Sequence, residues 1–126
     1  MKKAVLTNLA PKPAGPYSQA IVANGFVFVA GQIPNDPATG KIESDDLAAQ
    51  TERTLENVKA ILEAAGSSLD KLVKVNVYLT DIRDFKAMNE VYARYIKGDA
   101  PPVRTTIEMG ACRDARKIEI DCVALA

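Results

Sequence analysis

Arg104 is the residue of this chain whose type and position point most directly to chemistry. It lies in segment 101–107, whose other residues are typical of a buried strand. Alternation predicts one strand face with Val103, Thr105, Ile107 and Met109, and another with Arg104, Thr106 and Glu108. Because a guanidinium stays charged in proteins, it needs water, a fixed carboxylate or a ligand. Its partner therefore decides much of the function.

The absence of histidine limits the chemistry that is possible. It excludes His-based triads, histidine metal sites and imidazole acid–base catalysis. Catalysis must then use carboxylates, Tyr, Cys, hydroxyls, Arg, Lys or backbone groups. The two cysteines, Cys112 and Cys122, are too few for a disulfide scaffold and form no CxxC motif. We therefore expect reduced thiols and a cytoplasmic protein.

Length and composition are those of a soluble globular protein. The 126 residues predict one domain, 1–126, and 48% are apolar and 25% charged. Sixteen basic and sixteen acidic residues cancel, and no basic run exceeds Lys2-Lys3, which argues against nucleic-acid binding. The apolar stretch near 21–30 is too short to cross a bilayer, and the N-terminus lacks the apolar core of a signal peptide.

The hydrophobic pattern predicts six strands and two helices. Strands are expected at 3–7, 19–23, 26–30, 72–80, 103–109 and 117–124. The helices are expected from about Ser44 to Gly66 and from Phe85 to Ile96. Their buried stripes would be Leu47, Thr51, Leu55, Val58 and Leu62 in the first, and Phe85, Met88, Tyr92 and Tyr95 in the second. The order β-β-β-α-β-α-β-β predicts an α+β two-layer fold, with a mixed six-stranded sheet and both helices on one face.

The second face of this sheet is expected to be partly polar. It would carry Lys74, Asn76, Arg104, Thr106, Glu108, Glu119 and Asp121, interleaved with Val123, Leu125 and one side of strand 26–29. Residues 26–29 are all apolar, so both faces of that strand should be covered. Such a sheet face is either solvated or covered by another subunit, with its charges lining clefts between chains. The apolar share favours the second arrangement.

Several segments together resemble the Rid family of reactive intermediate deaminases, also called the YjgF or L-PSP family. They are Gly15-Pro16-Tyr17-Ser18-Gln19-Ala20, Gly31-Gln32-Ile33-Pro34, Asn57-Val58, Val75-Asn76-Val77-Tyr78-Leu79, Phe85 with Asn89 and Tyr92, Pro102-Val103-Arg104-Thr105 and Lys117-Ile118-Glu119-Ile120. The match runs in order along nearly the whole chain. The resemblance implies a chorismate-mutase-like fold and a homotrimer with three sites in the clefts between subunits.

The resemblance also implies an activity and a set of site residues. Family members with the strand arginine hydrolyse 2-iminopropanoate and 2-iminobutanoate to 2-oxo acids and ammonia, and these compounds are released by pyridoxal-phosphate dehydratases. Arg104 would hold the substrate carboxylate through two charge-assisted hydrogen bonds, each contributing roughly 1.5–3 kcal/mol. Glu119 would orient or activate water, or handle the proton on nitrogen. Tyr17 would form part of the pocket wall, Gly31 would allow close backbone approach to the ligand, and Asn89 matches a position near the site. The resemblance implies no metal or organic cofactor.

Three positions depart from the family pattern. Thr106 replaces a common cysteine, so the hydroxyl can hydrogen-bond water but no cysteine nucleophile is available there. Ala30 replaces a serine, and Cys112-Arg113 replaces a Leu-Pro turn whose backbone helps to shape the cleft.

Other interpretations remain open. Arg104 can instead form an ion pair with Glu108 or Asp121, and Glu119 can be a solvated carboxylate on the sheet. A non-catalytic, carboxylate-binding or regulatory trimer would fit the same fold, and the altered 110–114 turn favours it. The L-PSP name suggests a ribonuclease or translation inhibitor, but zero net charge and the lack of histidine argue against it.

Overall fold

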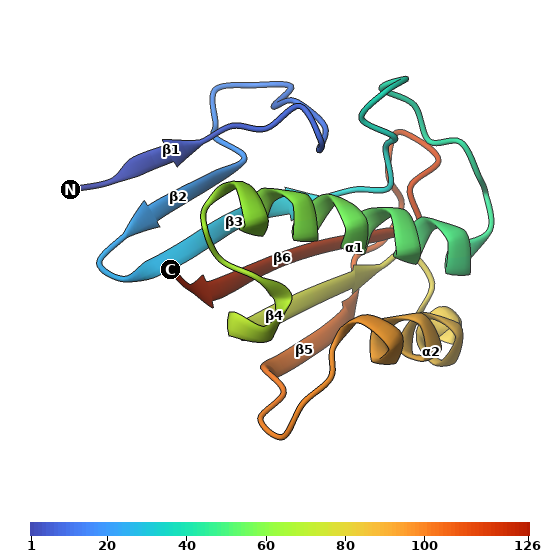
Figure 1. The fold of residues 1–126 in the computed structure, drawn as a ribbon. Coiled ribbons are helices and arrows are strands. Elements are labelled where there is room, and N and C mark those ends of the chain that lie inside the picture. The colour runs from blue at the N-terminus through green and yellow to red at the C-terminus, as the bar shows by residue number, and fades with distance from the viewer.

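One sheet with both helices on the same face makes up the architecture (Figure 1). The structure is a computed structural model that describes residues 1–126. The strands are β1 (Lys3–Val5), β2 (Ala20–Ala23), β3 (Phe26–Gln32), β4 (Leu72–Leu79), β5 (Val103–Glu108) and β6 (Ile118–Leu125). The helices are α1 (Leu47–Ala64) and α2 (Phe85–Tyr95), with short 3-10 turns at Leu69–Lys71 and Ile82–Asp84. The predicted element order and fold class are confirmed.

The sheet is mixed, with the strand order β1-β2-β3-β6-β4-β5. Only β4 and β5 are parallel, and α2 connects them. The Asn24-Gly25 turn between β2 and β3 has positive φ at both residues, as its hairpin requires. β3 runs past the predicted end at residue 30 to Gln32, with a register shift between Val29 and Gln32. This irregular end of β3 belongs to the candidate site.

Local capping sets the bounds of α1. The N-cap is Asp46 rather than Ser44, and its carboxylate accepts a hydrogen bond from the Ala49 amide at 2.9 Å. The Ser44 hydroxyl instead accepts from the Asp46 amide at 3.0 Å. At the other end Gly66 has φ +80°, a left-handed conformation that glycine adopts easily and that commonly ends a helix. The predicted end of this helix at Gly66 is confirmed.

The core lies between the helices and the sheet. All five predicted stripe residues of α1 are buried: Leu47, Thr51, Leu55, Val58 and Leu62. The predicted stripe of α2 is only partly correct. Met88 and Tyr92 are buried, whereas Tyr95 is half-buried and Phe85 is exposed. The Phe85 ring is instead 5.4 Å from the guanidinium carbon of Arg104 in the edge strand β5, so a charged side chain replaces core there.

The predicted faces of β5 are reversed. The parallel register pairs Val75 with Arg104 and Val77 with Thr106, so these β5 side chains point to the helix side of the sheet. Val103 is instead 66% exposed on the open face. Alternation places the apolar residues of β5 toward the helices and Arg104 on the open face, and the structure shows the opposite. Arg104 is accommodated under α2 because its guanidinium packs against two aromatic rings there.

The open face of the sheet mixes apolar and polar side chains. Phe28 is 47% exposed, so the prediction that both faces of strand 26–29 are covered is wrong for the isolated chain. In the centre of the face, Asn76 and Tyr78 donate hydrogen bonds to the Asp121 carboxylate, each at 2.8 Å. The hydrogen bond from Tyr78 to Asp121 is the main reason that the pKa of Tyr78 is raised. Val103, Ile107 and Leu125 are further exposed apolar residues. Neither helix is long and apolar enough to cross a membrane.

Candidate functional site

The first part of the candidate site is the arginine subsite, formed by Phe85, Asn89, Tyr92, Arg104 and Thr106. Arg104 donates a hydrogen bond from Nη1 to Asn89 Oδ1 at 2.7 Å. Its guanidinium carbon lies 4.7 Å from the centroid of the Tyr92 ring and 5.4 Å from that of Phe85. The amide and the two rings hold the charged group in one orientation and leave other N–H donors free.

Arg104 forms no ion pair within the chain. Its predicted alternative partners are engaged elsewhere. Glu108 accepts a hydrogen bond from the Ile82 amide at 2.9 Å, and Asp121 is on the opposite face of the sheet. The buried Thr106 hydroxyl also lacks a partner. A half-buried guanidinium with free donors is a site for a small anion.

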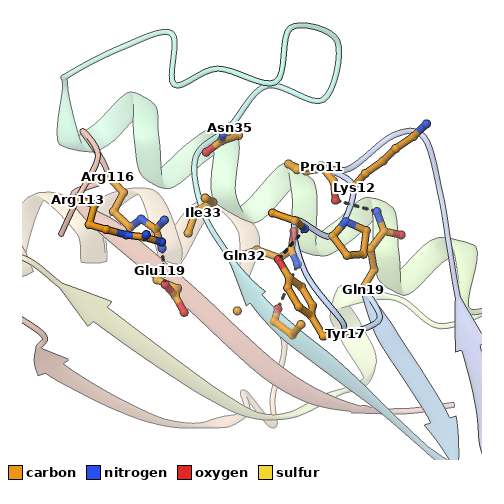
Figure 2. Close-up of a pocket in the computed structure, with 14 residues that line it drawn as sticks. Pro11, Lys12, Tyr17, Gln19, Gln32, Ile33, Asn35, Arg113, Arg116 and Glu119 are labelled. Atoms are coloured by element: carbon orange, nitrogen blue, oxygen red, sulfur yellow. Dashed lines mark hydrogen bonds and ion pairs between the residues drawn. The ribbon is translucent and has the colours of Figure 1, made fainter.

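The second part is the glutamate cleft, a hollow of about 550 Å³ at the end of the sheet (Figure 2). Its walls are the loop before β2, the end of β3 and the loop between β5 and β6. The lining residues are Pro11, Lys12, Pro13, Ala14, Tyr17, Gln19, Ala30, Gly31, Gln32, Ile33, Asn35, Arg113, Arg116 and Glu119. Three predicted site residues, Tyr17, Gly31 and Glu119, therefore share one cavity.

Gly31 is required by the position of Glu119. A Cβ atom built on Gly31 would overlap Glu119 Oε2 and would lie 3.0 Å from the Glu119 carboxyl carbon. The carboxylate therefore sits directly against the backbone of β3. On its other side, Glu119 Oε1 is 3.1 Å from Nη1 of Arg116. The missing side chain of Gly31 and the charge of Arg116 together fix the carboxylate in the cleft.

Tyr17 contributes its ring to the wall of the cleft (Figure 2). Its hydroxyl accepts a hydrogen bond from the Ala14 amide at 3.2 Å, which closes the Pro- and Gly-rich loop on itself. The side chain is 55% exposed. Tyr17 thus packs at the entrance rather than inside the core.

Two buried glutamines hold the loops of the cleft, and sequence reasoning missed this role. Gln19 accepts from the Thr7 amide at 2.7 Å and donates to the Thr7 and Pro11 carbonyls at 3.0 and 2.9 Å. Gln50 donates to the Ala115 carbonyl at 3.0 Å and accepts from the Lys117 amide at 2.7 Å. The available signal was a polar residue within an otherwise apolar strand or helix face.

The loop before β6 adds positive charge to the cleft. Arg116 contacts Asp114 at 2.7 Å as well as Glu119. Hydrogen bonds from Arg116 lower the pKa of Asp114 to about 2, and the bond to Asp114 raises the pKa of Arg116. Arg113 also lines the cleft but has no carboxylate within 4.0 Å. Sequence reasoning noted Arg113 as a departure in the turn but did not select Arg116 or Lys12.

One copy of the chain does not bring all predicted site residues together. Arg104, Asn89 and Thr106 form the arginine subsite on the helix side of the sheet. Tyr17, Gly31 and Glu119 form the cleft, and the register of β6 against β4 puts Glu119 on the open face. The prediction that Arg104 and Glu119 share a sheet face is therefore wrong. The structure contains no cluster of three or more Cys, Asp or Glu side chains able to hold a metal ion.

Comparison with known proteins gives the family. The model of the family described as Endoribonuclease L-PSP matches residues 7–126. The chain belongs to the Rid/L-PSP family. The resemblance inferred from the sequence segments is thereby confirmed.

Rid/L-PSP relatives are similar over almost the whole chain. A RutC family protein of Pyrococcus horikoshii is 53% identical over 124 residues, 98% of each chain. The chloroplastic Reactive Intermediate Deaminase A of Arabidopsis thaliana is 43% identical over 123 residues, which are 98% of this chain and 65% of the plant protein. The crystal structure of Escherichia coli TdcF with bound serine is 37% identical and has a TM-score of 0.92, with 98% of each chain covered. These matches support the α+β fold and deaminase-type activity in the family.

Proposed function

We propose that this Rid/L-PSP protein hydrolyses 2-imino acids and their enamine tautomers to 2-oxo acids and ammonia in the cytoplasm. The substrates would include 2-iminopropanoate and 2-iminobutanoate, so the protein would remove reactive metabolic intermediates. The observation that carries the proposal is the oriented, half-buried Arg104 with no carboxylate partner. A deaminase-named relative and a related structure that holds serine, a small carboxylate, support it.

The proposed site forms between copies of the chain. Arg104 and Glu119 are on opposite faces of one sheet, so a substrate that contacts both must meet them from different copies. The exposed apolar residues Phe28, Val103 and Ile107 favour coverage of the open face by a neighbour. A contact that joins two different surfaces closes into a ring when its rotation permits. We propose a ring of three copies, with each arginine subsite facing the next copy's glutamate cleft.

The chemistry follows from the groups on either side of this cleft. Arg104 binds the carboxylate of the substrate through its free N–H donors and so fixes the adjacent imine carbon. Glu119 accepts a proton from water, whose oxygen attacks that carbon. Glu119 passes that proton to nitrogen, which gives a carbinolamine. Glu119 then moves the hydroxyl proton of the carbinolamine to nitrogen, so that the carbonyl forms as the carbon–nitrogen bond breaks and ammonia leaves. One imine and one water thus give one 2-oxo acid and one ammonia, without a redox step. Thr106 can hydrogen-bond the substrate or water beside Arg104.

A carboxylate-binding or regulatory role is the second candidate. The observation in its favour is the ion pair between Arg116 and Glu119, because it occupies one oxygen of the carboxylate that would have to accept the proton from water. Under this alternative the site would bind a 2-oxo acid without turnover.

Competition for the imine separates these functions. Threonine dehydratase releases 2-iminobutanoate in the presence of semicarbazide, and this protein should reduce semicarbazone formation from the imine. Arg104→Ala should abolish that effect, while Arg94→Ala, which removes an exposed arginine from α2, should preserve it. The proposal would be contradicted if the well-folded wild type did not reduce semicarbazone formation from the imine, or if Arg104→Ala reduced it equally. Binding of 2-oxobutanoate without diversion would support the second candidate.

A further inference from the structure

The glutamate cleft has more positive charge than one substrate carboxylate requires. Its lining includes three cations, Lys12, Arg113 and Arg116, but only one carboxylate, that of Glu119. The chain as a whole has no net charge. The excess of cations is therefore a local property of the cleft.

The contacts distinguish the roles of the two arginines. Arg116 is engaged on both sides, by Asp114 at 2.7 Å and by Glu119 at 3.1 Å. It also donates from Nε to Asp114 at 2.8 Å, so its charge serves to hold the loop and the carboxylate. Arg113 has no hydrogen bond or ion pair from its side chain to the rest of the chain. Figure 2 shows both arginines on the Glu119 side of the cleft.

Arg113 is thus available to bind an anion in the cleft. No carboxylate of the chain neutralises its charge, whereas Arg116 is paired with both Asp114 and Glu119. A guanidinium beside a hollow of about 550 Å³ can bind a carboxylate by donating two parallel hydrogen bonds. Lys12 lies on the opposite, N-terminal loop of the cleft, and its amine points away from Glu119 (Figure 2).

We propose that Arg113 selects 2-imino acids with a second carboxylate in the side chain, the imines of acidic amino acids. The inference rests on the proposed function, in which Arg104 of a neighbouring copy binds the carboxylate next to the imine carbon. Arg113 binds the side-chain carboxylate from the other end of the cleft, and Glu119 is between them as the base. Arg113 is a specificity residue and takes no part in proton transfer.

The test compares two imines with the same semicarbazide readout. A flavin oxidase that acts on glutamate releases the dicarboxylic imine, and threonine dehydratase releases 2-iminobutanoate. The measured quantity is the ratio of kcat/KM for the dicarboxylic imine to kcat/KM for 2-iminobutanoate. Arg113→Ala should lower this ratio about tenfold, the effect of losing one partly exposed charge-assisted contact. Arg113→Glu should lower it further, and Arg94→Ala should leave it unchanged.

Binding supplies an independent measurement. In calorimetry the wild type should bind 2-oxoglutarate more tightly than 2-oxobutanoate, and Arg113→Ala should remove that preference. An unchanged kcat/KM ratio and an unchanged binding preference in well-folded Arg113→Ala would overturn the inference. If the wild type still hydrolyses 2-iminobutanoate in the semicarbazide assay, the proposed function stands and only the specificity role of Arg113 fails. If the wild type diverts neither imine, the proposed function itself fails.

Discussion

Replacing Gly31 by alanine tests whether the position of the Glu119 carboxylate matters for activity. Gly31 is in β3 and its φ is outside the left-handed region, so its backbone permits alanine. The added methyl group, however, would overlap Glu119 Oε2 and lie 3.0 Å from the carboxyl carbon. The methyl group therefore has to displace the carboxylate rather than the backbone.

The expected effects on activity and on stability are different in size. Carbon atoms in ordinary contact are about 3.5–4.0 Å apart, so the carboxyl carbon must retreat by roughly 0.5–1 Å and the overlapping Oε2 must move farther. A misplacement of about 1 Å in a catalytic group costs on the order of a hundredfold in rate. The shift also strains the contact between Glu119 and Arg116. The free energy of unfolding should change by less than about 1 kcal/mol, because alanine is tolerated in a strand.

The assay is a double-mutant cycle in the semicarbazide competition experiment. Gly31→Ala should lower kcat/KM about a hundredfold in the wild-type background. In the Glu119→Ala background the same change should have little further effect, because there is no carboxylate left to displace. Equal losses in both backgrounds, or full activity of Gly31→Ala with wild-type Tm, would refute the reasoning.

The remaining predictions concern thiols, acid stability and the loop anchor. Burial raises the pKa of the Cys122 thiol to about 12. A thiol reagent near neutral pH should therefore modify Cys112 first and Cys122 only when the protein unfolds. Rapid reaction of both thiols in the folded protein would contradict this prediction. Arg116 lowers the pKa of Asp114 from 3.8 to about 2, so this ion pair stabilises the fold above about pH 4 and loses its effect as pH falls to about 2. The wild type should therefore have a higher Tm than Asp114→Asn above about pH 4, and this difference should vanish as pH falls to about 2. A Tm difference that persists below about pH 2 would show that the ion pair does not cause it. Gln19→Leu should cost about 3 kcal/mol in chemical denaturation, because four backbone groups of the N-terminal loop lose their partners. A neutral result would show that water replaces them.

The fold was predictable because its signals are local. Leu55 and Val58 follow the helical period of α1, and Gly66 ends that helix in the conformation that glycine favours. The Asn24-Gly25 pair specifies the hairpin between β2 and β3. The extra residues of β3 were not predictable, because the register shift near Gly31 depends on pairing with β6.

The face of Arg104 was not predictable from alternation. Alternation divides β5 into two sets of residues but does not say which set faces the helices. The more apolar set, Val103 and Ile107, is on the open face, where two-layer packing alone would not place it. That inversion is expected where a second copy covers the sheet and a charged side chain has a function under α2.

The grouping of the cleft residues also required the structure. Tyr17 and Glu119 are far apart in the sequence and meet only because β3 pairs with β6. Arg116 gave no signal of its own, since its role depends on a loop that Gln50 holds in place.

Mixing two inactive variants tests the central claim most directly, namely that Arg104 and Glu119 act on one substrate from different copies. Arg104→Ala and Glu119→Gln should each show only residual activity in the imine competition assay. When the two are unfolded and refolded together at equal concentration, one site in each mixed ring of three regains both wild-type residues, which is about a quarter of all sites after random mixing. We therefore expect recovery of roughly a quarter of wild-type activity. Mixed assemblies that stay as inactive as the separate variants would contradict a site shared between copies.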